Sequence, residues 1–271
     1  MRRVQGAGVT LAVRDEGEGA PALLIHGFPD SSRLWRHQVP RLVDAGLRVI
    51  APDLRGLGES DRPEDVAEYR ILRSVADMVA LLDGLGIERA RVVGHDWGAA
   101  VAWVLAAFVP DRVERLAVLS VGHPNVARQR TVEDRERAWY MLLFQFEGVA
   151  EELIARDDWR LMREWLRGDG DVEHYVADLA RPGALTAGLN WYRANARPDR
   201  ELAPRRDVPV VSAPTLGLWS TRDHYLREEP MVSSAEHVSG PWRYERIEDA
   251  SHWMQLDAAE RVGYLLVEFL R

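Results

Sequence analysis

The chain has 271 residues, of which 46% are hydrophobic and 29% charged, a balance typical of a globular protein with one large domain or one domain carrying an insertion. Its net charge of −8 at pH 7 argues against nucleic acid and anionic membranes as partners, because phosphate groups are bound by clustered positive charge. The sequence contains no lysine and no cysteine, which excludes lysine Schiff-base chemistry, thiol nucleophiles, disulfides and thiolate metal sites.

The N-terminus, residues 1–8, lacks the apolar stretch of a secretory signal peptide. The longest apolar run, at about residues 99–109, is shorter than the roughly 20 residues that a helix needs to cross a bilayer. We therefore expect a cytoplasmic enzyme with no membrane partner.

The first half of the chain alternates between strand and helix patterns. Helical spacing of apolar residues occurs at 34–43, 66–85 and 97–109. The alternation indicates βαβ units and a parallel sheet with helices on both faces. Short apolar or alternating runs predict the strands, which lie at residues 9–14, 22–26, 47–51, 91–93 and 116–121.

The pattern changes at about residue 123, after which only helical periodicity is found as far as residue 206. The strand pattern returns at residues 215–219 and 242–247, and a last helix begins at about residue 258. The sequence therefore predicts a core domain of residues 1–122 and 207–271, interrupted by an all-helical domain of residues 123–206.

The segment Gly94-His95-Asp96-Trp97-Gly98 stands between a predicted strand and an alanine-rich predicted helix. Its spacing is that of the nucleophile elbow, a sharp strand-to-helix turn whose glycines relieve crowding of the backbone. A helix N-terminus favours negative charge, and a carboxylate needs no base to remove a proton before it attacks. Asp96 is therefore the candidate nucleophile. The alternative is a helix N-cap beside packing glycines.

A second motif, His26-Gly27-Phe28-Pro29, follows the predicted strand at residues 22–26. Folds with a nucleophile elbow place here a loop whose backbone N–H completes an oxyanion hole. The expected donors are the backbone amides of Phe28 and Trp97. A plain strand-ending turn is the alternative, because Gly and Pro favour turns wherever they occur.

His252 is the candidate general base. Of the eight histidines it is the one that comes last, as the base does in the chain order nucleophile, acid, base. The acid that orients it is expected after a strand, and Asp223 meets this condition. Asp249 is the runner-up, three residues before His252.

Four motifs in chain order together resemble the epoxide hydrolase branch of the α/β-hydrolase fold superfamily, and the resemblance covers essentially the whole chain. It implies a mostly parallel central sheet flanked by helices, with an all-helical cap inserted after the sixth strand. The stretch 53–60 is expected to shape a turn rather than take part in chemistry. The motifs are residues 26–29, 53–60, 94–98 and 251–253.

The resemblance also implies two cap tyrosines whose hydroxyls face the nucleophile. The segment around Trp139-Tyr140 resembles the one that bears the first, and Asn190-Trp191-Tyr192 resembles the second more closely. Tyr140 and Tyr192 are therefore the candidate acids. Tyr140 also lies four residues before Phe144, a spacing that is equally typical of a core stripe. The altered sequence at residues 145–148 leaves the register of the first tyrosine open.

The expected function is the opening of a small hydrophobic epoxide to a vicinal diol through an ester on Asp96, which water activated by His252 then hydrolyses. No metal and no organic cofactor is expected, and a homodimer is compatible with the resemblance. Two alternatives stay open. One is a haloalkane dehalogenase with the same Asp nucleophile, and the other is a ligand-binding protein that kept the fold without turnover.

Overall fold

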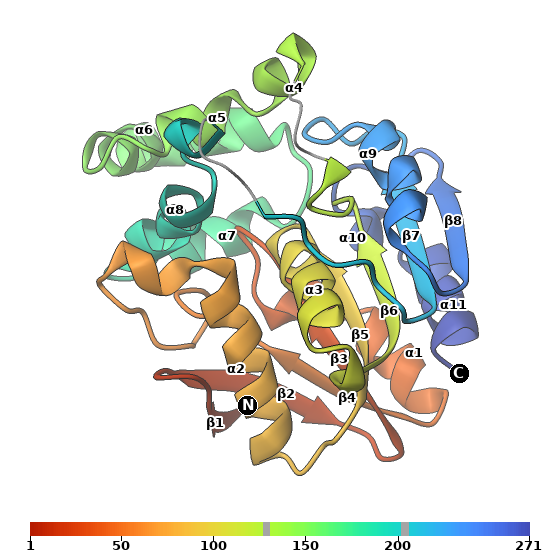
Figure 1. The fold of residues 1–271 in the computed structure, drawn as a ribbon. Helices are drawn as coiled ribbons and strands as arrows, with labels where there is room; N and C mark the ends of the chain where they lie inside the picture. Colours follow the sequence, from red (N-terminus) through yellow and green to blue (C-terminus); the bar gives the residue numbers. More distant parts are fainter. Residues whose placement is uncertain (127–130, 202–205) are drawn as a thin grey trace.

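The computed structural model of the protein describes residues 1–126, 131–201 and 206–271. Its described part contains one eight-stranded sheet in the order β1-β2-β4-β3-β5-β6-β7-β8 (Figure 1). The pairs β1–β2 and β2–β4 are antiparallel, and all other neighbours are parallel. The strands are β1 Arg2–Gln5, β2 Thr10–Glu16, β3 Ala20–Ile25, β4 Leu47–Pro52, β5 Ala90–His95, β6 Val113–Leu119, β7 Thr215–Ser220 and β8 Trp242–Ile247.

Helices cover both faces of the sheet, as parallel strands require because both of their faces must be buried. α2 (Ile71–Gly84) and α3 (Trp97–Phe108) pack together on one face, whereas α1 (Gln38–Asp44) and α11 (Ala259–Leu270) pack together on the other (Figure 1). α3 is buried along most of its length, which explains why its sequence is apolar on all sides.

The regular elements in the described part of the segment between β6 and β7 are helices, apart from an isolated bridge at Val211, and they lie beyond the C-terminal ends of the parallel strands (Figure 1). α6 is interrupted at residues 156–159, where the backbone leaves the helical region. Further short helices, α9 (Glu228–Ser233) and α10 (Met254–Asp257), follow β7 and β8. The helices of the segment are α4 Val132–Arg137, α5 Trp139–Leu143, α6 Val149–Leu166, α7 Val172–Leu179 and α8 Ala184–Asn195.

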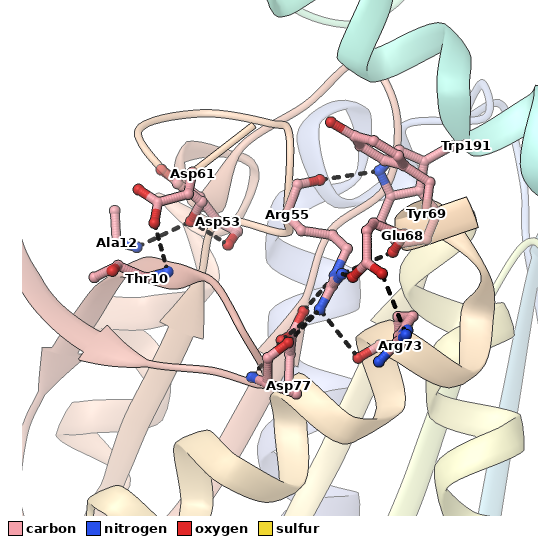
Figure 2. Close-up of polar contacts among 12 residues, drawn as sticks. Thr10, Ala12, Asp53, Arg55, Asp61, Glu68, Tyr69, Arg73, Asp77 and Trp191 are labelled. Atoms are coloured by element: carbon pink, nitrogen blue, oxygen red, sulfur yellow. Dashed lines mark hydrogen bonds and ion pairs between the residues drawn. The ribbon is translucent and has the colours of Figure 1, made fainter. Parts of the chain in front are cut away.

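α8 is attached to the core by hydrogen bonds of Trp191 and Asn195. The indole N–H of Trp191 donates to the carbonyl of Arg55 over 3.1 Å (Figure 2). The side chain of Asn195 donates to the carbonyl of Tyr69 over 2.8 Å and accepts from the amide of Ile71 over 3.1 Å.

The loop that carries Arg55 is itself fixed by a buried ion pair (Figure 2). The Arg55 guanidinium is fully buried and donates to both carboxylate oxygens of Asp77, at 2.7 and 2.8 Å. Burial raises the pKa of Asp77, and Arg55 opposes that rise. Because a bidentate pair restricts both side chains, the loop presents its carbonyl to Trp191 in one position.

The predicted fold class is confirmed, and so is the helical segment after the sixth strand. Two predicted elements were wrong in detail. The helix expected at 66–85 is a 3-10 turn, Val66–Tyr69, followed by α2, because Arg70 is extended between them. The helix expected at 34–43 is likewise divided into Ser32–Trp35 and α1. Strand β1 was not predicted, because its residues Arg2–Gln5 are mostly polar and exposed.

Candidate active site

Asp96 occupies a sharp turn between β5 and α3, with φ 53° and ψ −123°. Two glycines are required by close backbone approaches. A Cβ on Gly94 would lie 2.4 Å from the carbonyl oxygen of Gly98, and a Cβ on Gly98 would lie 2.1 Å from that of Ile25. The predicted strand-to-helix turn is therefore present. Holding a non-glycine residue in this conformation costs on the order of 1–3 kcal/mol, and such strain is concentrated at functional sites.

The Asp96 carboxylate faces the loop after β3. Its Oδ1 accepts a hydrogen bond from the amide of Phe28 over 2.9 Å, and the approach is so close that a Cβ on Gly27 would lie 2.2 Å from that oxygen. Burial raises the pKa of Asp96, while His252 and the amides of Trp97 and Phe28 oppose the rise. Both amides expected to form an oxyanion hole thus favour negative charge here.

His252 lies between two carboxylates. Its Nδ1 hydrogen-bonds to Asp223 Oδ2 at 2.8 Å, and its Nε2 lies 3.8 Å from Asp96 Oδ2. Burial alone would lower the pKa of His252, but Asp223 and then Asp96 raise it above its usual value. A base that is held at Nδ1 and free at Nε2 can take a proton from a water beside Asp96.

Asp223 is fixed by the loop that follows it. Its Oδ1 accepts from the amides of Tyr225 and Leu226 at 2.8 and 2.9 Å, so one carboxylate oxygen is left for His252. Asp249, the runner-up for this position, is exposed. The structure therefore brings Asp223 to His252, and not Asp249.

Two other histidines support the backbone of the site. His95 donates to the carbonyl of His252 over 2.9 Å, and His26 accepts from the amide of Leu54 over 2.9 Å. Burial lowers the pKa of both imidazoles. The turn at residues 53–60 is built in the same way, since the Asp53 carboxylate accepts from the amides of Ser32 and Glu59.

Tyr140 and Tyr192 come from the helical segment, on α5 and α8. Both line the same pocket as Asp96 and His252. Their rings are 5.8 Å apart at 81°, and the Tyr192 ring also meets Phe28 and Trp97 edge to face. Burial and the nearby Asp96 raise the pKa of the Tyr192 phenol well above its usual value, so it remains a proton donor.

These side chains enclose a pocket of about 220 Å³, here called the inner pocket. Three of its aromatic residues were not predicted from the sequence. Trp253 could have been predicted, because it follows His252 directly in the sequence. Trp165 and Tyr225 come from segments without a motif, so nothing in the sequence indicates them. The lining residues are Phe28, Asp96, Tyr140, Trp165, Tyr192, Tyr225, His252 and Trp253.

A further buried carboxyl, Asp30, lies behind this pocket. Its Oδ2 accepts from the indole N–H of Trp253 over 2.8 Å. Burial raises the pKa of Asp30 to about 7, although Trp253 and the nearby Tyr175 phenol oppose the rise. Asp30 was not predicted as a site residue, because it lies just outside the loop motif of residues 26–29.

Within the described ranges, no group of three or more His, Asp or Glu side chains is arranged to hold a metal ion. In the same part of the chain, no helix has both the length and the apolar character that a bilayer crossing requires.

Comparisons with known proteins agree with this geometry. The alpha/beta hydrolase fold family matches residues 21–259. Epoxide hydrolase A of Mycobacterium tuberculosis is 37% identical over 99% of this chain and 96% of its own length. The AB hydrolase superfamily protein YfhM of Bacillus subtilis is 34% identical over 97% of this chain and 95% of its own length. The crystal structure of epoxide hydrolase A from Mycobacterium thermoresistibile superposes with a TM-score of 0.85 at 35% identity, covering 100% of this chain and 97% of that one.

Proposed function

The chain belongs to the epoxide hydrolase branch of the α/β-hydrolase fold superfamily, and on this basis we propose that it converts small apolar epoxides into vicinal diols through an ester on Asp96. The observation that carries the proposal is the pairing of a carboxylate with two phenols across one pocket. A strained ring needs a nucleophile on one side and an acid for its oxygen on the other.

In the first step, the Asp96 carboxylate attacks a ring carbon that is held at near-attack distance. A new carbon–oxygen bond to Asp96 forms as the ring carbon–oxygen bond breaks. The departing oxygen takes a proton from Tyr192, with Tyr140 as the second donor. Positioned acid catalysis of this kind is typically worth about 10²–10⁴-fold in rate.

In the second step, His252 removes a proton from water, which attacks the ester carbonyl carbon of Asp96. The amides of Phe28 and Trp97 stabilise the negative oxygen that develops there, and each such donor is typically worth about 10²–10³-fold. The bond from the carbonyl carbon to the alkyl oxygen then breaks, and His252 returns the proton to the diol as it leaves. The second proton of the water remains on the re-formed Asp96 carboxyl and passes to the Tyr192 phenolate, which restores both groups. Asp223 keeps the imidazole oriented throughout.

Release of halide from a haloalkane would use the same nucleophile but needs no proton donor. The two phenols in the pocket of Asp96 would then have no role in the reaction. For this reason we favour an epoxide over a haloalkane as the substrate. A serine esterase is excluded, because the elbow carries Asp96 where such enzymes have serine.

The test is to incubate the protein with styrene-type and aliphatic epoxides and to measure diol formation. We expect turnover by the wild type and a loss on the order of 10⁴-fold or more in Asp96→Ala. Asp249→Asn is the matched control, because Asp249 is exposed and its φ of 58° suits asparagine. Bromide release from bromoalkanes without diol from any epoxide would overturn the proposal.

A further inference from the structure

Two aromatic residues, Trp165 and Tyr225, separate the inner pocket from a second, larger pocket. This outer pocket, of about 790 Å³, is lined in addition by Trp139, His224 and four charged side chains. Among the described lining residues, Trp165 and Tyr225 are the ones common to both pockets. The charged residues of the outer pocket are Glu133, Glu136, Arg137 and Arg167.

The two residues come from different parts of the fold and are joined by one hydrogen bond. Trp165 is near the end of α6, and Tyr225 lies in the loop after β7. The Tyr225 hydroxyl donates to the carbonyl of Trp165 over 3.1 Å, and the ring centroids are 5.8 Å apart at 75°. Together they form a wall between the pockets, here called the aromatic partition.

The space behind the partition is small. The inner pocket measures about 220 Å³ with the space that is open to solvent included. Because Trp165 and Tyr225 line it, a long or bulky substituent on an epoxide beside Asp96 meets their rings.

Hydrogen bonds and an ion pair fix the backbone on both sides of Tyr225. The partition can therefore open by rotation of the Tyr225 side chain. The amide of Tyr225 donates to Asp223, and Arg137 donates to the carbonyl of Asp223 over 3.1 Å. Two residues further on, Arg227 pairs with Asp134. For the phenol ring to swing away, its hydroxyl bond to Trp165 and its edge-to-face contacts with His252 and Trp253 have to break.

The Trp165 indole also has a polar group that finds no hydrogen-bond partner among the described residues while the partition is closed. Its indole Nε1 is buried and has no hydrogen-bond partner in the described part of the chain. A buried unpaired donor is unfavourable, and displacement of the ring toward the outer pocket would let water bind it. Ring contacts with Tyr140 and Phe144 hold Trp165 in the closed position, and opening would provide a partner for its indole N–H.

We propose that Trp165 and Tyr225 set the length of substrate that the enzyme accepts, with short epoxides turned over behind the closed partition and longer ones reaching into the outer pocket when it opens. This inference rests on the proposed function. It assigns Tyr225 as a specificity-determining residue rather than as part of the chemistry.

The experiment compares kcat/KM for propylene oxide, hexene oxide and decene oxide. In the wild type we expect kcat/KM to fall from hexene oxide to decene oxide. Tyr225→Ala should raise the ratio of long to short substrates about tenfold or more, the scale on which pocket size discriminates between alkyl groups. Tyr225→Phe, which keeps the ring and loses the bond to Trp165, should shift the ratio in the same direction by less.

Trp165→Leu tests the partition from its other side, and it keeps the proposal open to refutation if Tyr225→Ala does not fold. The control is Tyr244→Phe, which removes a hydroxyl bonded to Glu228 at 2.7 Å outside both pockets. It should leave the ratio unchanged. Unchanged ratios in the Tyr225 and Trp165 variants, with normal diol formation from propylene oxide, would overturn the partition and leave the proposed function intact. No diol from any epoxide would overturn the function itself.

Discussion

The two sides of the inner pocket face each other but are held by different forces. The core wall, made of Phe28, Asp96 and His252, is fixed by hydrogen bonds. The Phe28 amide donates to Asp96, and His252 is held by Asp223, whose other carboxylate oxygen accepts from two backbone amides. The helical wall, made of Tyr140, Trp165 and Tyr192, is packed mainly through ring contacts of 4.7–6.5 Å. Hydrogen bonds are directional and ring contacts are much less so. A site built in this way can hold its reacting atoms rigidly and still adapt to the shape of a substrate.

The largest effect is expected in the core wall, at His252. His252→Gln should lower steady-state turnover on the order of 10³-fold or more, because the glutamine amide cannot act as a base. Alkylation should continue, since the first step makes no use of His252. Mass spectrometry of the peptide that contains Asp96 should then show the mass of the bound substrate.

His37→Gln is the matched control, because His37 is exposed at the start of α1. It should turn over as the wild type does. If His252→Gln also turned over normally, or if no ester accumulated on Asp96, the division of labour between the two walls would be wrong.

The next effect is expected in the helical wall, at Tyr192. Tyr192→Phe should slow alkylation by about 10²-fold, because the leaving oxygen loses its proton donor. The rate at which the ester is hydrolysed should stay unchanged. Rapid-quench measurement of the two steps separates them, and the ring contacts that phenylalanine keeps should preserve folding.

Tyr264→Phe on α11 provides the control, since its side chain is 59% exposed and remote from the pocket. Equal alkylation rates in Tyr192→Phe and the wild type would mean that Tyr192 only packs. In that case the helical wall would shape the pocket without taking part in the chemistry.

The difference between the walls also explains what the sequence could and could not predict. Phe28, Asp96 and His252 stand in short motifs at strand ends, and the sheet order brings these ends together. Local sequence therefore predicted their positions. Asp223 has a weaker motif, but its place after β7 was enough to prefer it over Asp249.

The helical wall follows from packing between segments that are far apart in the chain. Trp165 and Tyr225 are 60 residues apart, and nothing in either segment indicates that they meet. Tyr140 and Tyr192 were predicted by resemblance rather than by pattern, because helical spacing also fits a core stripe. The break at Arg70 was missed for a similar reason, since the contacts of Asn195 with Tyr69 and Ile71 come from α8.

A smaller effect is expected where α8 is attached to the core, at Asn195. Asn195→Ala removes bonds to the carbonyl of Tyr69 and the amide of Ile71. It should lower the free energy of unfolding by about 1–3 kcal/mol, because backbone groups lose their partners. Alkylation should slow several-fold, since α8 carries Tyr192, while ester hydrolysis should not change.

Asn125→Ala is the matched control for Asn195→Ala. The Asn125 side chain likewise bonds one backbone carbonyl and one backbone amide far away in the sequence, both of them of Val208. The variant should cost similar stability without slowing alkylation. If both variants slowed alkylation equally, the hydrogen bonds of Asn195 would have no special part in placing Tyr192.

The smallest effect on activity is expected behind the core wall, at Asp30, where the change is in stability and depends on pH. Burial raises the pKa of Asp30 from 3.8 to about 7 in the folded protein, so the folded state binds more protons than the unfolded state between these values. The stability that this group contributes is therefore full below about pH 4 and is lost as pH rises through 7. Asp30→Asn cannot ionise, so it should be as stable as the wild type near pH 4 and more stable at pH 8.

Thermal unfolding at several pH values measures this difference, at roughly 2–4 °C of Tm per kcal/mol for a chain of this size. Asp15→Asn should show the opposite sign, because Arg48 holds the pKa of Asp15 below its usual value. Its carboxylate stabilises the fold above pH 4, and that contribution is lost as pH falls. Parallel Tm curves for Asp30→Asn and the wild type would show that Asp30 ionises as freely in the folded protein as in the unfolded chain. The core wall would then be better hydrated behind Trp253 than its burial implies.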